Sequence, residues 1–296
     1  MHQFETIQDS LLVRAPAKIN LSLLVTGKRP DGFHGLRTIM AKVDWYDNLL
    51  FEHAEQDGID LLCQGSYWAP TSNENLIYKA ITKLCEIIGK PPKIKITLTK
   101  NIPAGSGLGS ASSDAAAALI GYNKFENLNL PIKTLTILAT QLGSDVPFFL
   151  GGTLALCEGR GEKLTNIGQN YNFKALLVLP GINTSTKGVY EHYIHDSALF
   201  ERLNSKFQQH LTENRLDLIV KMCANMLEES CFGLHPEIAG LKYKIEQLGL
   251  TPLCLSGSGS TLYHILQDGD TDLSDYQSTL KSKFGCDSVI VKNNDW

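Results

Sequence analysis

The chain has 296 residues, 43% of them hydrophobic and 20% charged, which is typical of a globular protein large enough for two domains. Its formal net charge of −4 gives no reason to expect a broad cationic surface for nucleic acid or anionic lipid. The seven scattered cysteines include no C-x-x-C pair, which argues against a disulfide framework or a zinc site and favours reduced thiols.

The N-terminal segment Met1–Leu12 has no arginine and no apolar core, so we expect neither a signal peptide nor a transit peptide. No apolar run reaches the length of about 20 residues that spans a bilayer. We therefore expect a cytoplasmic protein without membrane or nucleic-acid partners. The sequence leaves the oligomeric state open.

The first hundred residues alternate between strand and helix signals. The predicted elements are strands at 11–26, 36–44, 48–52 and 93–99 and a helix at 76–88. Lys93–Thr99 alternates strictly between polar and apolar residues, as a half-buried strand does. The residues Trp45–Asp47 are predicted to interrupt a strand, and Asp145–Val146–Pro147 further along is predicted to be a loop or turn.

The rest of the chain mixes strands and helices without a regular βαβ rhythm. The predicted helices are at 113–119, 131–142, 196–229 with a break near 212–214, and 236–248, and the predicted strands are at 151–157, 175–179 and 252–266 around a Gly/Ser turn. This order predicts an α+β fold with mixed sheets rather than a doubly wound parallel sheet. A polar, glycine-bearing segment suggests two domains, residues 1–158 and residues 159–296.

A glycine-rich loop lies between the most regular strand and an alanine-rich helix. The loop consists of Pro103, Ala104, Gly105, Ser106, Gly107, Leu108, Gly109, Ser110, Ala111, Ser112 and Ser113. Glycines allow the backbone to approach a ligand closely, and the free N–H groups of the following helix attract anions. The unit of strand, glycine loop and helix therefore predicts a phosphate-binding site, although a loop of this composition could also be a plain turn.

Two other glycine motifs do not fit this loop. A P-loop requires a lysine after its last glycine, and none follows Gly109. A dinucleotide fingerprint would need a third glycine at Ser110 and a position in the first βαβ unit, whereas this loop follows about a hundred residues of other structure.

Three segments resemble the motifs of the galactokinase, homoserine kinase, mevalonate kinase and phosphomevalonate kinase superfamily, the GHMP kinases. They are Pro16–Leu21, Pro103–Ala116 and Leu255–Thr261, in the same order and spread over nearly the whole chain. The strings Asp31–His34 and Gly143–Phe148 are most similar to the 4-diphosphocytidyl-2-C-methyl-D-erythritol kinases of the non-mevalonate isoprenoid pathway.

The resemblance implies a two-domain kinase with its active site between the domains, ATP and Mg²⁺ as cofactors, and a small cytidyl diphosphate substrate phosphorylated on its 2-hydroxyl. It implies a catalytic pair, Lys18 and Asp145, and an ATP phosphate loop at residues 103–113. The other implied contacts are Asn75 and Lys100 for adenosine, Phe33, Tyr190 and His34 for the cytosine ring, and Asn20 and Thr186 for the rest of the substrate. Position 33 is more often tyrosine in that family, so stacking should survive here without the hydroxyl.

The chemistry of phosphoryl transfer explains why these residue types would matter. Transfer needs in-line placement and neutralisation of phosphate charge, and a carboxylate such as Asp145 can accept the proton of the acceptor alcohol. Lys18 would sit between that carboxylate and the substrate. The plainer alternatives are a turn aspartate before Pro147 and a surface lysine on a strand edge.

Magnesium ligands are not assigned, because no acidic cluster has ligand spacing. Two competing functions remain open at this point. One is another GHMP kinase acting on homoserine, mevalonate or a sugar, and the other is a catalytically inactive regulator that binds nucleotide.

Overall fold

The computed structural model describes residues 2–168, 171–266 and 274–296, which form two β-sheets. The strands of the first sheet are β1 Phe4–Ile7, β2 Ser10–Lys28, β3 His34–His53, β4 Gly58–Gly65, β5 Lys93–Lys100, β6 Leu154–Gly159 and β7 Lys163–Asn166. The strands of the second sheet are β8 Lys174–Leu179, β9 Cys254–Leu255, β10 Leu262–Ile265 and β11 Asp287–Lys292.

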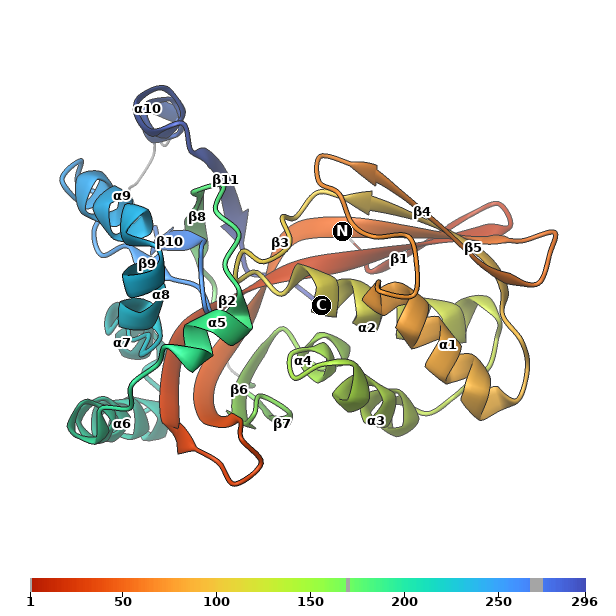
Figure 1. The fold of residues 1–296 in the computed structure, drawn as a ribbon, viewed down its shortest axis with the longest axis horizontal. Coiled ribbons are helices and arrows are strands. Elements are labelled where there is room, and N and C mark those ends of the chain that lie inside the picture. The colour runs from red at the N-terminus through yellow and green to blue at the C-terminus, as the bar shows by residue number, and fades with distance from the viewer. Residues whose placement is uncertain (1, 169–170, 267–273) are drawn as a thin grey trace.

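Each sheet has its own set of helices, and Figure 1 shows the two groups beside each other. The helices with the first sheet are α1 Leu76–Ile88, α2 Ser110–Phe125, α3 Ile132–Leu142 and α4 Val146–Leu150. The helices with the second sheet are α5 Thr186–Glu191, α6 Ser197–Thr212, α7 Leu216–Lys221, α8 Glu228–Leu234, α9 Pro236–Glu246 and α10 Ser274–Phe284. Across the described ranges, no helix is both long enough and apolar enough to cross a membrane.

The strand pairing confirms the predicted fold class. The first sheet has the order β1-β2-β3-β5-β4, and β6 pairs with β3 and with β7. Its strands β4 and β5 are parallel and its other pairs are antiparallel. The second sheet, β11-β8-β10-β9, is antiparallel. A mixed sheet and an antiparallel sheet, whose strands alternate irregularly with helices along the chain, are typical of an α+β protein.

The long hairpin of β2 and β3 belongs to two hydrophobic cores. Leu11 and Val13 of β2 are buried with α1, α2 and the outer strands of the first sheet. Further along the same strand, Ile19 and Leu21 are buried with the second sheet and its helices. Figure 1 shows the hairpin running from one group of elements into the other. The groove between the groups is therefore lined by residues from the second half of β2 and the first part of β3.

Helix α1 shows why the most local sequence signals were reliable. Asn75 caps its first turn by accepting a hydrogen bond from the Ile77 N–H at 2.9 Å, and Gly89 ends it in the left-handed conformation with a φ of 65°. Ile77, Ile81 and Leu84 are buried on one face. The predicted bounds of this helix are confirmed, as is the strand β5 that follows it.

Two predictions for the first half were wrong. The interruption at Trp45–Asp47 is a bulge, since β3 is continuous and the pairing shifts where Tyr46 faces Pro16 but Val43 faces Ala17. The segment with Pro147 begins helix α4 instead of remaining a loop. Proline is tolerated in a first helical turn because no intrahelical partner is needed for an N–H there.

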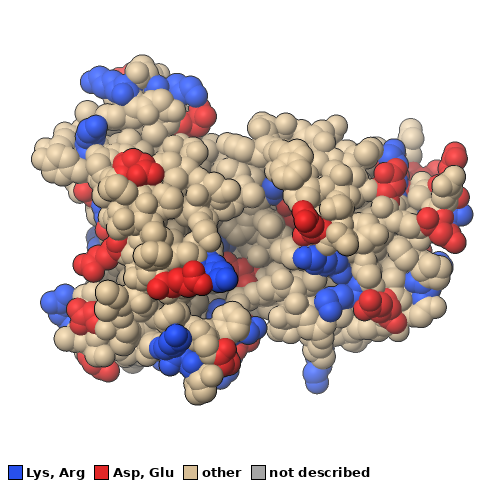
Figure 2. Space-filling view, in the orientation of Figure 1, with Lys and Arg blue, Asp and Glu red and all other residues tan. Residues whose placement is uncertain are grey.

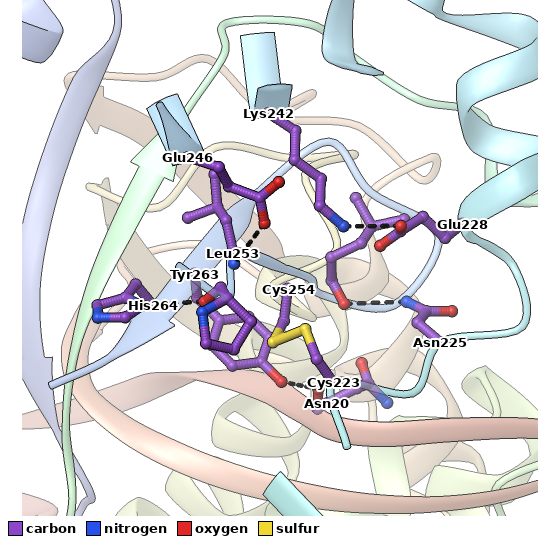
Figure 3. The surroundings of a disulfide bond; sticks show 12 residues. Asn20, Cys223, Asn225, Glu228, Lys242, Glu246, Leu253, Cys254, Tyr263 and His264 are labelled. Atoms are coloured by element: carbon purple, nitrogen blue, oxygen red, sulfur yellow. Dashed lines mark hydrogen bonds and ion pairs between the residues drawn. A yellow bond between two sulfur atoms is a disulfide. The ribbon is translucent and has the colours of Figure 1, made fainter. Parts of the chain in front are cut away.

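The expectation that all cysteines are reduced was also wrong. Cys223 and Cys254 form a disulfide with their Cα atoms 5.4 Å apart (Figure 3), although 31 positions separate them in sequence. Next to it, Asn225 donates hydrogen bonds to the carbonyl oxygens of Leu255 and Gly257, at 2.9 and 2.7 Å. The disulfide thus lies beside the Gly/Ser turn between β9 and β10. Cysteine spacing gave no sign of this pairing, because the tertiary fold brings the two segments together.

Candidate active site

The glycine loop takes a conformation that only glycine adopts easily. Gly107 and Gly109 have φ angles of 79° and 69°, in the left-handed region. A side chain at Gly107 would collide with the carbonyl oxygen of Ser256. A Cβ atom at Gly109 would lie 2.9 Å from both the Lys18 side chain and the Phe149 ring. These glycines therefore allow the loop to fit between β2, α4 and the turn before β10.

The carbonyl groups of the loop bind the rest of the protein, whereas its N–H groups remain unused. The carbonyl oxygens of residues 105–108 accept hydrogen bonds from Thr184 N, Thr261 N, Ser256 Oγ and Lys18 N, at 2.9–3.0 Å. In the described part of the chain, the N–H groups of residues 104–109 donate to no other group. Free N–H groups next to the N-terminus of α2, a 16-residue helix, suit a phosphate group.

A cavity of about 880 Å³ lies beside this loop, between the two groups of elements, where Figure 2 shows the surface hollowed. Most of the residues predicted from the sequence line it: Lys18, Asn20, Phe33, His34, Pro103, Gly105, Ser106, Gly107, Gly109, Ser110, Ala111, Ser112, Asp145, Thr186 and Tyr190. Five predicted residues are not part of its lining: Asn75, Lys100, Ala104, Leu108 and Ser113.

Lys18 and Asp145 meet at the wall of the cavity. The Lys18 ammonium lies 3.6 Å from the Asp145 carboxylate, and the two side chains are 4% and 30% exposed. Lys18 also donates to Asn20 Oδ1 at 2.5 Å, and the Asn20 amide donates to Thr38 Oγ1 at 2.8 Å. This chain of contacts holds the ammonium in one place while the carboxylate remains open to the cavity.

The aromatic residues are arranged differently from the expected sandwich. The ring stacked on Tyr190 is that of His34, with centroids 5.3 Å apart, and Tyr193 contacts His34 edge-on at 5.6 Å. Phe33 is 54% exposed, and the Arg160 guanidinium lies over its ring at 4.5 Å. The His34 ring thus covers a face of the Tyr190 ring, on which the expected sandwich would place the base.

Burial lowers the pKa of His34, and the nearby charges of Lys28 and His195 act in the same direction. At neutral pH the imidazole is therefore uncharged. A neutral imidazole has one N–H donor and one acceptor nitrogen, which suits recognition of the polar edge of a base.

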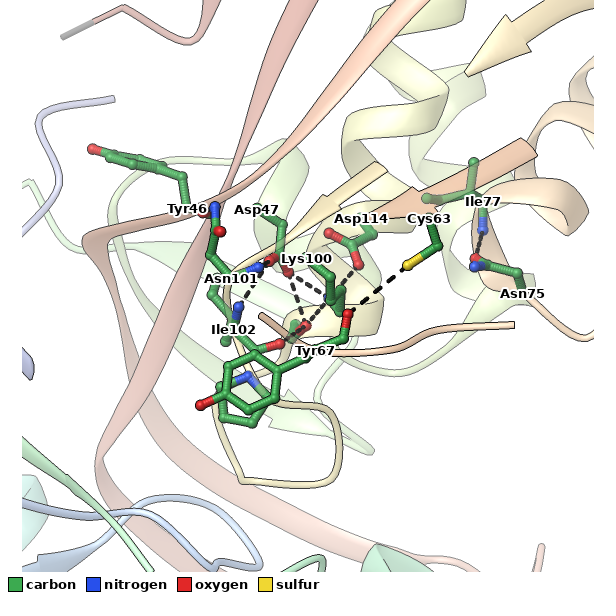
Figure 4. A network of polar contacts seen from close by, with 12 residues as sticks. Tyr46, Asp47, Cys63, Tyr67, Asn75, Ile77, Lys100, Asn101, Ile102 and Asp114 are labelled. Carbon is green, nitrogen blue, oxygen red and sulfur yellow. Dashed lines mark hydrogen bonds and ion pairs between the residues drawn. The ribbon is translucent and has the colours of Figure 1, made fainter. Parts of the chain in front are cut away.

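Lys100 is part of a buried polar network instead of the cavity wall, as Figure 4 shows. Its ammonium binds the carboxylates of Asp47 and Asp114 and the hydroxyl of Ser110. Asp47 also accepts hydrogen bonds from the backbone N–H groups of Asn101 and Ile102, at 2.6 and 2.8 Å. The network thus joins the end of β5 to the first residue of α2 and closes the glycine loop at its base.

Asn75 has an equally structural set of contacts, since it caps α1 and donates to the carbonyl oxygen of Pro70 at 2.6 Å. The role of Asn75 and Lys100 in adenosine binding remains a prediction. Sequence reasoning missed several residues of the cavity wall, including Lys28, Thr38 and Arg160. Arg160 lies in the polar segment that we interpreted only as a domain boundary.

Comparison with known proteins agrees with this geometry. Residues 75–153 match the GHMP kinases N terminal domain, and residues 198–277 match the GHMP kinases C terminal domain. A 4-diphosphocytidyl-2-C-methyl-D-erythritol kinase of Bacillus cereus (strain B4264) is 38% identical over 256 residues, covering 86% of this chain and 88% of the relative. The chain belongs to the GHMP kinases. As a member of this family it is a small-molecule kinase, and GHMP kinases use ATP.

Two further comparisons support membership of the GHMP kinases. The kinase of the same name from Clostridium botulinum (strain Eklund 17B / Type B) is 37% identical over 256 residues, covering 86% of this chain and 91% of that protein. A crystal structure of a 4-(cytidine 5'-diphospho)-2C-methyl-D-erythritol kinase has a TM-score of 0.72 and 29% identity, covering 96% of this chain and 99% of the other. The predicted two-domain GHMP kinase fold is therefore confirmed.

Proposed function

We propose that this chain transfers the γ-phosphate of ATP to the 2-hydroxyl of 4-diphosphocytidyl-2-C-methyl-D-erythritol, a step of the non-mevalonate isoprenoid pathway. The observation that carries the proposal is the Lys18–Asp145 pair, 3.6 Å apart, in the same cavity as a glycine loop with unused N–H groups. The relatives at 37–38% identity are named 4-diphosphocytidyl-2-C-methyl-D-erythritol kinases, which supports the choice of substrate.

ATP would bind with its phosphates against residues 103–113. The free N–H groups and the N-terminus of α2 offer hydrogen-bond donors and a partial positive charge to the phosphate oxygens. Among the described residues, no group of three or more His, Cys, Asp or Glu side chains could hold a metal ion. Mg²⁺ is commonly bound by substrate phosphates together with one or two protein oxygens, so the phosphates of ATP would supply most of its ligands here. Bound Mg²⁺ supplies neutralisation of the phosphate charge.

In the proposed reaction, a new bond forms between the acceptor oxygen and the γ-phosphorus, and the bond to the ADP oxygen breaks. Asp145 accepts the proton of the acceptor hydroxyl, since its carboxylate is partly exposed to the cavity. Lys18, whose ammonium lies 3.6 Å from this carboxylate, orients the hydroxyl, while Asn20 holds the Lys18 ammonium.

For the cytidyl group, we propose that Phe33 and Tyr190 hold the cytosine ring after the His34 ring has moved off Tyr190. His34 would then contact the polar edge of the base, and Asn20 and Thr186 would line the rest of the substrate site. Stacking between a base and an aromatic side chain is worth about 1–3 kcal/mol, which is enough to displace a weaker contact between side-chain rings.

The proposal also divides the labour between residues 1–158, which would mainly bind ATP, and residues 159–296, which would mainly bind the substrate. Phe33 and His34 are contributions of the first part to substrate binding. The pairing of β7 with β6 keeps the residues up to Asn166 beside the first sheet. A cytoplasmic location, where ATP is available, is part of the same proposal.

The proposal is tested with a panel of acceptor alcohols. The purified chain is mixed with ATP, Mg²⁺ and, separately, the cytidyl substrate, homoserine, mevalonate or galactose, and the release of ADP is measured. We expect turnover with the cytidyl substrate alone. Turnover with another alcohol would identify a different kinase of the family, and ATP binding without any turnover would favour a regulator.

The role of Asp145 is tested by Asp145→Asn. We expect kcat to fall by about 10²–10⁴-fold while ATP still binds, because the variant loses the base but keeps the shape of the site. The matched control is Asp217→Asn in α7, whose carboxylate is 40% exposed and pairs with Arg215. An Asp145→Asn variant with most of its kcat would rule out this base.

A further inference from the structure

Lys42 of β3 is the cross-strand neighbour of Lys18 in β2. Side chains directly opposite one another in an antiparallel pair lie on the same face of the sheet. Both lysines are buried, with 2% and 4% of their surface exposed. Two ammonium groups therefore leave the same face of the hairpin, under the short helix α4.

The two lysines contact opposite ends of this helix. Lys18 lies 3.6 Å from Asp145, which directly precedes α4 as its N-cap residue. The Lys42 ammonium donates hydrogen bonds to the carbonyl oxygens of Phe149 and Gly151, at 3.2 and 2.9 Å, at the C-terminal end. Cations are favourable at this end of a helix, where the last carbonyl groups lack intrahelical partners.

The backbone around Lys42 attaches the same segment to the sheet. Its N–H donates to the carbonyl oxygen of Thr153 at 2.8 Å, two residues beyond Gly151. Phe149, whose carbonyl oxygen binds the Lys42 ammonium, also has its ring next to Gly109 of the phosphate loop. The position of α4 relative to β3 therefore affects both the proposed base and the proposed phosphate site.

The charge of Lys42 is costly to bury at this position. Burial lowers the pKa of Lys42 to about 8, which means that the folded protein disfavours the charged form. No carboxylate is among the hydrogen-bond partners of its ammonium within the described chain. An apolar side chain of similar length would avoid the desolvation cost.

We propose that Lys42 is a positioning residue for phosphoryl transfer: by binding the carbonyl oxygens of Phe149 and Gly151, it fixes α4 against β3 and holds the Asp145 carboxylate at its distance from Lys18. This inference rests on the proposed function in one respect, the role of Asp145 as the base. It requires neither the cytidyl substrate nor the cytosine pocket.

The test uses Lys42→Met, which keeps the length of the side chain but removes its charge and its donors. We expect kcat to fall by about tenfold, KM for ATP and for the acceptor to change by less than about twofold, and Tm not to fall. Lys42→Gln, which retains N–H donors, should recover part of the lost kcat. Lys95→Met, on an exposed part of β5, is the control and should keep the wild-type kcat.

A double-mutant cycle distinguishes positioning through Asp145 from a general structural effect. If Lys42 acts through Asp145, Lys42→Met should cost no further activity in an Asp145→Asn background. Equal losses in both backgrounds, an unchanged kcat in Lys42→Met, or a Lys42→Met variant that fails to fold would each overturn the proposal.

The same measurements separate this proposal from the proposed function. The assay uses whichever acceptor the panel identifies, so a different substrate would leave the test of Lys42 intact. If Asp145→Asn retains its activity, the proposed base is wrong. The kcat of the single Lys42→Met variant then shows whether the position of α4 affects catalysis independently of Asp145.

Discussion

Two lysines of the first sheet are buried almost equally, yet their surroundings differ completely. Lys100 is 1% exposed and binds two carboxylates, whereas Lys42 is 2% exposed and, among the described residues, its ammonium binds only backbone carbonyl oxygens. Burial acts to lower the pKa of Lys100, but the charges of Asp114 and Asp47 outweigh it and keep this pKa above its usual value. Burial acts alone on Lys42 and lowers its pKa to about 8.

The difference shows that burial alone does not decide whether a buried ammonium group stabilises the folded protein. Lys100 neutralises carboxylates that would otherwise be buried without a cation, so the network at the base of the glycine loop depends on it. In the part of the chain that the structure describes, the Lys42 ammonium has no such partner charge, and we look for its contribution in the position of α4.

The largest effect is expected for Lys100→Met. Removing the ammonium leaves Asp47 and Asp114 buried without a cation, so the free energy of unfolding should fall by about 3–5 kcal/mol. Chemical denaturation at pH 7 measures this loss. The control is Lys95→Met in the same strand. The Lys95 side chain is 37% exposed and its ammonium lies 3.0 Å from the Glu52 carboxylate, so the variant should lose at most about 1 kcal/mol of unfolding free energy. Equal losses in the two variants would break the comparison.

An intermediate effect is expected in the pH dependence of Lys42. Between pH 8 and 10.5 the unfolded chain keeps the Lys42 proton while the folded protein releases it, so the contribution of Lys42 to the free energy of unfolding rises with pH. The rise over this window is about 3 kcal/mol. Wild type and Lys42→Met are denatured at pH 7 and at pH 10. The free energy of unfolding of wild type should increase relative to that of the variant between these two pH values. A constant difference between them would contradict the interpretation of Lys42 as a desolvated cation.

The smallest effect is expected for Asp114→Asn, which replaces one of the two carboxyl groups around Lys100 by an amide of the same shape. At pH 4 the free energy of unfolding should change by about 1 kcal/mol or less, because Asp47 still pairs with the ammonium.

The pH dependence of Asp114→Asn sharpens this prediction. Burial raises the pKa of Asp114 against the opposing charge of Lys100, so above pH 4 the folded protein keeps a proton that the unfolded chain releases. Wild type should therefore lose stability relative to the variant as the pH rises. The opposite slope would mean that Lys100 dominates the titration of Asp114.

Local signals allowed part of this structure to be predicted from the sequence. The apolar spacing within α1 and the breaker after it, the alternation of β5 and the glycines before α2 each act within a few residues of the element that they define. The predictions failed where distant segments decide the outcome. The bulge near Trp45 depends on pairing with β2, and the disulfide of Cys223 depends on the position of β9.

The residues of the candidate site show the same division. Lys18, Asp145 and the glycine loop were found through motifs, and the fold brings them to one cavity. Lys42 was not singled out, because nothing near it in the sequence distinguishes it from a surface lysine. Its burial comes from α4 and from the C-terminal segment, where the Asn294 N–H donates to the Lys42 carbonyl oxygen.

The β2–β3 hairpin has a mechanical consequence for the cavity. Both strands run from one core into the other, so a hinge motion of the two halves would bend this hairpin, whose pairing shifts at Pro16/Ala17 and Asn20/Ser22. Side chains at the rim can move without such bending, and there Arg160 rests on the half-exposed ring of Phe33 in the cavity wall. A shift of these two side chains would change the access of water to the cavity while the hairpin keeps its shape.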